Sequence, residues 1–160
     1  MKIIRTGIGF DAHKLRKGRR LVLGGVEFKH KSGLDGHSDA DVLSHAIMDA
    51  LLGAIADGDI GVHFKNTDPR WKDVSSIALM HIVRKRLKAR GARVINIDST
   101  LMAEKPKVMF RQLEMRTNIA KALGIPVGRV SIKATTLETM GAIGREEGMA
   151  AMAVATVERK

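Results

Sequence analysis

A run of small and apolar residues at helical spacing restricts the possible folds of this chain more than any other feature. Every fourth position is valine or alanine, with larger apolar residues beside them: Val42, Ala46, Ala50, Ala54, Leu43, Ile47 and Leu51. A helix that is apolar on nearly all sides must be buried. Ser38 is a suitable N-cap, Asp41 completes an approximate capping box, and Gly58 marks the end. We therefore expect a buried helix of about four turns.

Strands are predicted on both sides of this helix. Apolar residues that alternate or cluster in short runs predict strands over residues 3–10, 21–23, 26–28, 92–104, 130–136 and 149–158. The last of these is rich in alanine and is equally compatible with a helix. Gly24-Gly25 joins the second and third strands as a two-residue hairpin turn.

Two further helices follow the buried one. The first begins at Ser75 or Ser76 and ends at Gly91, and the second begins at Pro106 and ends at Gly124. The order of elements predicts an α/β (α+β) fold that forms a single domain over residues 1–160. We expect a sandwich in which a mixed four- to five-stranded sheet carries helices on one face. Strands with small residues often need cover from another subunit, so self-association is expected.

Composition limits the environment and the available chemistry. Hydrophobic residues make up 44% of the 160 residues, but no run reaches the length of about 18 that suggests a membrane span. The first residues lack the apolar core of a signal peptide, so we expect a cytoplasmic protein with no membrane partner. The chain has no cysteine, which excludes disulfides and thiolate ligands. Any metal must therefore be held by histidine and carboxylate.

The formal net charge of +11 is compatible with anionic partners of several kinds. Proteins that bind single-stranded nucleic acid usually stack bases on aromatic side chains. One tryptophan, four phenylalanines and no tyrosine provide little for such stacking. We therefore favour a solvated basic surface over nucleic-acid binding, and attraction of a polyphosphate substrate fits either alternative.

Three residues form a candidate ligand set for a divalent metal. Asp11 and His13 lie at the end of the first strand, where alternation places them on one face. His45 lies about two turns inside the buried helix. One carboxylate and two imidazoles suit Zn²⁺, with Mn²⁺ or Co²⁺ as substitutes, and leave a coordination position open. The alternative is a polar residue on a helix and an unrelated loop pair.

Several other segments carry groups that suit phosphate. His37 and Ser38 precede the helix, where its dipole favours anions. The segment from Ala103 to Lys107 provides two lysines at a predicted helix start. Residues 133–138 offer threonine hydroxyls and Glu138, which suit phosphate oxygens and Mg²⁺. Arg145 lies in a glycine-rich turn that could clamp phosphate. Each signal also has a plain structural explanation, such as capping, strand propensity or a turn.

The order of these motifs resembles the 2-C-methyl-D-erythritol 2,4-cyclodiphosphate synthase family. The motifs that carry the resemblance are Gly9–His13, Gly36–His45, Gly58–Gly61, Lys105–Lys107, Lys133–Thr136 and Gly144–Gly148. The resemblance covers nearly the whole chain. It implies a metal-dependent lyase whose substrate is 4-diphosphocytidyl-2-C-methyl-D-erythritol 2-phosphate. In that reaction the 2-phosphate attacks the β-phosphorus, CMP leaves, and a cyclic diphosphate forms.

The resemblance also implies roles for individual residues. Asp11, His13 and His45 match the zinc ligands, and Glu138 matches the ligand of a second cation, Mg²⁺ or Mn²⁺. His37 and Thr136 match residues that orient substrate and stabilise the transition state. The residues that match substrate contacts are Asp11, His13, His37, Ser38, Asp59, Ile60, Gly61, Phe64, Asp68, Ala103, Lys105, Pro106, Lys107, Met109, Thr135, Thr136, Glu138, Ala142 and Arg145. The implied assembly is a homotrimer with active sites between subunits, the nucleotide pocket coming from the neighbour.

Two positions depart from the family pattern. Lys65 stands where proline is common in a mobile loop, and Ala142 stands where phenylalanine is common in the glycine-rich turn. Neither is a proposed metal ligand. Two other interpretations keep their own tests: a metal-dependent phosphoesterase that uses the same Asp-His-His set, and a basic nucleic-acid-binding module.

Overall fold

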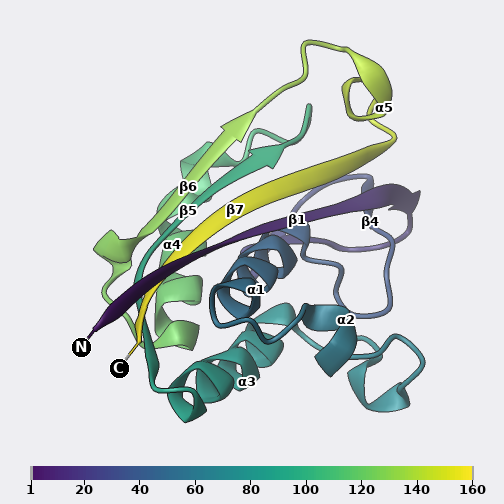
Figure 1. Ribbon diagram of the computed structural model, residues 1–160. Coiled ribbons are helices and arrows are strands. Elements are labelled where there is room, and N and C mark those ends of the chain that lie inside the picture. The colour runs from purple at the N-terminus through teal and green to yellow at the C-terminus, as the bar shows by residue number, and fades with distance from the viewer. Residues whose placement is uncertain (1, 160) are drawn as a thin grey trace.

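The apolar helix lies at the centre of the fold, as its sequence requires. In the computed structural model, which describes residues 2–159, α1 (Val42–Ala54) packs across β1 (Ile3–Lys17) and β7 (Gly148–Arg159). Nearly all of its side chains are buried, including the polar His45. Figure 1 shows the helix beneath the two long strands, whose outer ends bring the two chain termini together.

Five strands form one mixed sheet in the order β4-β1-β7-β5-β6. The remaining members are β4 (Ser32–Leu34), β5 (Ala92–Met102) and β6 (Val130–Thr135). The pair β5–β6 is parallel, and the other pairs are antiparallel. A separate hairpin joins β2 (Leu21–Leu23) and β3 (Val26–Phe28) through two glycines at positive φ, as predicted.

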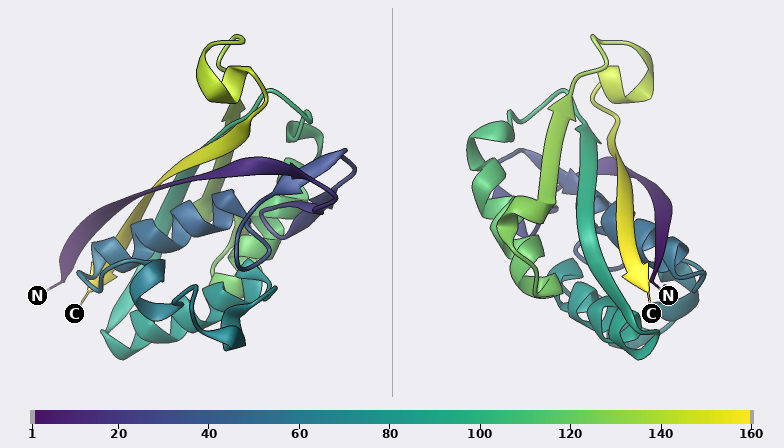
Figure 2. Two further views of the ribbon diagram at one scale, coloured as in Figure 1. Left: turned by 90° about the vertical axis from the view of Figure 1, so that its right-hand side faces the viewer. Right: turned by 60° about the vertical axis from the view of Figure 1, so that its left-hand side comes forward.

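Three long helices cover one face of this sheet, which confirms the predicted architecture (Figure 2). Besides α1 these are α3 (Ser76–Ala89) and α4 (Gln112–Leu123). The short elements are α2 (Ile60–His63), α5 (Gly141–Gly144), η1 (Pro69–Trp71), η2 (Met109–Arg111) and η3 (Val127–Arg129). None of the helices within residues 2–159 is both long and apolar enough to cross a bilayer.

Two glycines of β1 let the backbone of α1 approach the strand unusually closely. A Cβ added at Gly9 would lie 2.0 Å from the carbonyl oxygen of Ala46, and one added at Gly7 would lie 2.2 Å from that of Ala50. The alanines therefore form the helix surface that meets the glycines of the strand. This approach places His45, next to Ala46, beside Asp11, which lies two residues after Gly9.

The opposite face of the sheet is partly apolar, and no helix within residues 2–159 covers it. Exposed side chains on neighbouring strands form a stripe: Ile4, Ile8, Phe10, Met152 and Val154. The β1–β7 register pairs Ile8 with Val154 and Phe10 with Met152. Phe10 is 57% exposed, and Ile8 is 66% exposed. The hydroxyls of Thr6 and Thr156 separate Ile4 from the other four side chains, which form an exposed apolar patch. Such a patch is typical of an interaction face.

Several predicted element boundaries are wrong. The N-cap of α1 is Asp41, whose carboxylate accepts from the backbone N–H of Ser44, and not Ser38. Ala40 has a positive φ, so an α-helix cannot run through it. Pro106 does not begin a helix, because α4 starts only at Gln112, after η2. Strand β1 continues beyond Asp11 and His13 to Lys17.

Candidate metal centre and substrate site

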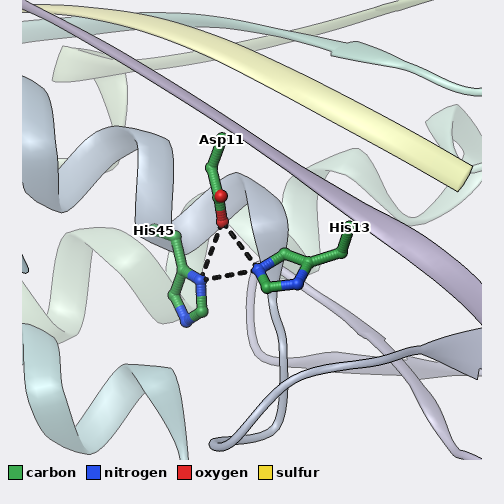
Figure 3. Close-up of side chains that lie close together, drawn as sticks. All are labelled: Asp11, His13 and His45. Carbon is green, nitrogen blue, oxygen red and sulfur yellow. Dashed lines mark hydrogen bonds and ion pairs between the residues drawn. The ribbon is translucent and has the colours of Figure 1, made fainter. Parts of the chain in front are cut away.

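The three predicted metal ligands lie together where β1 crosses α1. Asp11 and His13 extend from the same face of β1, and His45 extends from α1 toward them (Figure 3). The Asp11 Oδ2 atom is 2.9 Å from His13 Nε2 and 2.9 Å from His45 Nδ1. The two histidine nitrogens are 3.3 Å apart. Within residues 2–159, these three side chains form the group whose ligand atoms lie close enough together to hold a metal ion.

This geometry fits a small divalent cation. Ligand atoms of a tetrahedral zinc site lie about 2.0–2.2 Å from the metal, so neighbouring ligands are separated by roughly 3.3 Å. The observed separations of 2.9 to 3.3 Å are close to this requirement. Two imidazoles and one carboxylate also leave a coordination position open, as in catalytic rather than structural sites.

The side chains of the cluster are strongly coupled to one another by charge and hydrogen bonding. Burial opposes ionisation of Asp11, but hydrogen bonds from His13 and His45, together with their charges, outweigh it and hold the pKa of Asp11 well below its usual range. The hydrogen bond to Asp11 raises the pKa of His13, although burial acts against this. A bound cation would compensate the charge of the Asp11 carboxylate in the same place.

Both imidazoles are oriented by their second nitrogen. The Nδ1 atom of His13 lies 2.7 Å from the backbone oxygen of Asp35, which favours a proton on Nδ1 and leaves Nε2 free for a metal. The Nε2 atom of His45 lies against two hydroxyl groups, 2.9 Å from that of Ser76 and 3.2 Å from that of Ser38. Both rings thus direct one nitrogen toward Asp11.

A cavity of about 620 Å³ opens beside the cluster. Its wall contains the three predicted metal ligands, Asp11, His13 and His45. It also contains five predicted substrate contacts and Lys65, one of the two departures from the family pattern. The five contacts are His37, Ser38, Ile60, Gly61 and Phe64. Asn66, Thr67, Trp71 and Leu79 complete most of its wall. The ring of Phe64 packs edge-on against Trp71, so the segment after α2 forms one side of the cavity.

Two other predicted contact residues lie next to this cavity rather than in its wall. Asp59 is the N-cap of α2, and its carboxylate accepts from the backbone N–H of Val62. Asp68 forms an ion pair with Arg70 at 2.6 Å, and the hydrogen bond from that guanidinium lowers the pKa of Asp68. His37 lies four residues before the true N-cap Asp41, so it is not at the immediate helix start that the sequence suggested.

The predicted nucleotide residues gather in a different cavity of about 130 Å³. It lies between the ends of β5 and β6 and the segment that follows β5. The predicted residues that line it are Ala103, Pro106, Lys107, Met109, Thr135 and Thr136. Lys105 instead pairs with Glu146 at 2.9 Å. None of these residues lines the cavity beside the metal cluster.

Glu138, Ala142 and Arg145 also lie apart from the metal cluster in this chain. The Thr136 hydroxyl donates to the Glu138 carboxylate at 2.5 Å, and Glu138 has a positive φ. Ala142 is exposed on α5, and the exposed Arg145 pairs with Glu147. Glu138 does not belong to the group of three metal-binding side chains. The structure thus divides the predicted residues into two sets. The metal set lies around Asp11, His13 and His45, and the nucleotide set lies around the smaller cavity and Glu138. The two sets do not meet within one chain.

Sequence reasoning missed several residues that hold the metal set in place. The guanidinium of Arg19 donates to the backbone oxygens of Leu34, Gly36 and Ser38, and so braces the loop that carries His37. Asp49 accepts from the backbone N–H of Ile60 at 2.8 Å, and burial raises its pKa. These are long-range contacts of single side chains with loop backbone, which leave no local pattern in a sequence.

The fold and the cluster define a class: α+β proteins with a candidate metal centre where a strand meets a buried helix. Comparison with known proteins identifies the family. The family model described as YgbB family matches residues 4–158, and the chain belongs to this family. The resemblance predicted from the sequence is therefore confirmed.

Relatives of known name cover almost the whole chain. The 2-C-methyl-D-erythritol 2,4-cyclodiphosphate synthase of Chlorobium phaeobacteroides is 55% identical over 98% of this chain and 99% of its own length. The solved structure of the bifunctional IspDF from Campylobacter jejuni has a TM-score of 0.95 at 39% identity. That match covers all of this chain and 43% of the longer protein. IspF of Plasmodium falciparum, solved as a CDP complex, has a TM-score of 0.86 at 29% identity, with 98% and 97% of the two chains covered.

Proposed function

We propose that this enzyme is a lyase that converts 4-diphosphocytidyl-2-C-methyl-D-erythritol 2-phosphate to 2-C-methyl-D-erythritol 2,4-cyclodiphosphate. An oxygen of the 2-phosphate attacks the β-phosphorus, the bond from that phosphorus to the CMP oxygen breaks, and CMP leaves. The observation that carries the proposal is the Asp-His-His cluster in the wall of a cavity of about 620 Å³, in a chain whose relatives bear the name of this synthase.

Asp11, His13 and His45 would hold Zn²⁺, with Mn²⁺ or Co²⁺ as substitutes. The observed donor set and separations support this assignment. When bound, the ion would supply Lewis acidity at a phosphate oxygen. Because the ligands must be deprotonated, His13 and His45 take part as neutral imidazoles.

The chain's own groups would position the substrate. His37 and Ser38 lie in the wall beside the cluster and would contact a phosphate. Ile60 and Gly61 lie in the same wall and would contact the methylerythritol unit, with Asp59 beside them. Phe64 would exclude water from that side of the cavity. Asp68, which lies beside the cavity, would contact the substrate from its edge. Catalysis then consists of positioning and charge neutralisation, without a covalent nucleophile.

The nucleotide set would bind the cytidine diphosphate end of the substrate. Ala103, Pro106, Lys107 and Met109 line a small cavity that would receive the cytidine, and Lys105 borders it. Thr135 and Thr136 would contact the diphosphate from the C-terminal end of β6. Glu138, held near Thr136, would bind the second cation, Mg²⁺ or Mn²⁺. Ala142 and Arg145 lie on the neighbouring turn and would contact the same end of the substrate.

We propose a homotrimer in which each active site joins the metal set of one subunit to the nucleotide set of its neighbour. Two observations support this assembly. The two sets do not meet within one chain, and the open sheet face carries an exposed apolar stripe. Because Ile8 and Phe10 are about two thirds exposed or less, burying each between subunits would contribute roughly 1–2 kcal/mol.

We further propose that the chain acts as a single domain in the cytoplasm. The family match from residue 4 to residue 158 supports the first point. The expectation of no membrane and no nucleic-acid partner stays a prediction, and salt-sensitive RNA binding by protein without bound zinc would contradict it.

Product analysis tests the proposed reaction. Purified protein with Zn²⁺ and Mg²⁺ should convert the CDP-linked substrate to CMP and a cyclic diphosphate in equal amounts, which phosphorus NMR distinguishes from linear products. Formation of linear phosphates alone would instead support a metal-dependent phosphoesterase. The matched control is protein that has been treated with a chelator and then reloaded with Mg²⁺ only.

A further inference from the structure

The ring of His45 is held on both sides, and the side away from the metal cluster faces buried hydroxyl groups. Its Nδ1 atom faces Asp11, while Nε2 lies 2.9 Å from the hydroxyl of Ser76. Ser76 is fully buried, and His45 is 6% exposed. The Nε2 atom is therefore shielded from solvent, and the buried hydroxyls take the place of water.

The hydroxyl of Ser76 has a second contact that fixes where its hydrogen points. It donates to Asp39 Oδ1 at 2.5 Å, and the other carboxylate oxygen of Asp39 accepts from the backbone N–H of Ser76 at 2.9 Å. A hydroxyl has one hydrogen to donate and lone pairs to accept with. Because Asp39 takes that hydrogen, the Ser76 oxygen is left to accept from His45 Nε2.

We propose that Asp39 and Ser76 are positioning residues that set the tautomer of His45 for metal binding. With its proton on Nε2, a neutral imidazole presents the Nδ1 lone pair toward the metal position. Without the Ser76 acceptor, Nε2 keeps only the more distant Ser38 hydroxyl at 3.2 Å. The proton then moves more readily to Nδ1, where it is donated to Asp11 and blocks the ligand atom. The inference rests on the proposed metal centre and deepens it.

The same contacts link the metal centre to the start of α3. Ser76 is the first residue of that helix, and the backbone N–H of Asp39 donates to the Val74 oxygen at 3.1 Å. Changing Asp39 or Ser76 therefore also weakens the start of α3. A control must lose a comparable buried hydrogen bond without touching the His45 ring.

Ser44 provides this matched control. It is buried in α1 directly before His45, and its hydroxyl donates to Asp41 at 2.7 Å. Its hydrogen bonds are made with Asp41 rather than with the metal ligands. Ser44→Ala should reduce stability as a buried polar deletion does, while leaving the tautomer of His45 unchanged.

The experiment measures zinc dissociation constants by chelator competition for the wild type and for Ser76→Ala, Asp39→Asn and Ser44→Ala, with melting temperatures recorded on the same samples. We expect Ser76→Ala and Asp39→Asn to bind zinc about 10- to 100-fold more weakly, the usual effect of losing an outer partner of a ligand. Ser44→Ala should keep the wild-type affinity at a lowered melting temperature. The visible absorption spectrum of the Co²⁺-loaded protein should change in Ser76→Ala and Asp39→Asn but not in Ser44→Ala.

Two results would overturn the inference: wild-type zinc affinity in Ser76→Ala, or an equal loss of affinity in Ser44→Ala, which would mean general destabilisation. Wild-type protein that takes up no zinc would contradict the proposed metal centre itself, and this inference with it. The outcomes therefore separate the failure of the positioning role from the failure of the proposed function.

Discussion

Replacing Gly9 with alanine should damage the metal centre without changing a ligand. The new Cβ would lie 2.0 Å from the Ala46 oxygen, whereas ordinary contact begins near 3.4 Å, so the backbones of β1 and α1 must separate by about 1.4 Å. Overpacking of this kind costs about 1–3 kcal/mol of unfolding free energy. For a chain of this size, that corresponds to a fall in melting temperature of roughly 2–12 °C.

The same separation should weaken metal binding. His45 follows the backbone of α1, while Asp11 and His13 follow β1, so the separation changes ligand distances that tolerate only about 0.2 Å. We expect zinc affinity, measured by chelator competition at a fixed protein concentration, to fall by more than about 10-fold.

The matched control is Gly53→Ala, in the same helix. A Cβ at Gly53 would meet its nearest neighbour, the Ile8 oxygen, at 3.8 Å, and alanine in a helix is favoured over glycine by roughly 0.5–1 kcal/mol. This variant should keep its zinc and melt at the same or a higher temperature. Wild-type stability and zinc affinity in Gly9→Ala would refute the argument that close approach of the two backbones builds the site.

Three other changes test separate parts of the account. His45→Ala should lose zinc and activity while the oligomer survives, and zinc retained at full stoichiometry would contradict the ligand assignment. Glu138→Gln should retain zinc but need more Mg²⁺ for turnover; an unchanged Mg²⁺ dependence would argue against its role. The third concerns Asp57, whose pKa is lowered by its hydrogen bond from Arg86, against burial. Its stabilising effect is complete above its ordinary pKa of 3.8 and is lost as pH falls through the lowered value. Asp57→Asn should therefore melt below the wild type at neutral pH, and the difference should narrow in acid; a gap that stays constant down to pH of about 2 would contradict this.

Local patterns in the sequence were sufficient to predict most of the fold. The apolar periodicity of residues 42–54 and the alternation in the strands predicted a central helix and a mixed sheet, both of which are present. The helix boundaries were less predictable. Ser38 and Asp41 are both good N-caps by type, and tertiary contacts of Asp41 with the backbone N–H groups of Gly24 and Gly25 decide between them.

The candidate site was only partly predictable for a similar reason. The two-residue spacing of Asp11 and His13 predicts a shared face, but nothing local shows that His45 lies over it. That position depends on the contact of Gly9 with the α1 backbone. The supporting groups, such as Ser76 and Arg19, act across long sequence separations and were not found. Resemblance to the family supplied the nucleotide set, which geometry within one chain leaves apart from the metal.

The central claim is that each active site combines two sets of residues from different copies of the chain, and subunit mixing tests it most directly. His45→Ala and Glu138→Ala are first assayed alone at a fixed Mg²⁺ concentration, then unfolded together and refolded, and the release of CMP is measured. Random mixing in equal amounts makes about three quarters of the trimers mixed, and each mixed trimer contains one intact site of its three. Roughly a quarter of wild-type activity should therefore be restored. Activity no greater than the sum of the separate variants, in samples shown to contain mixed trimers, would contradict the claim.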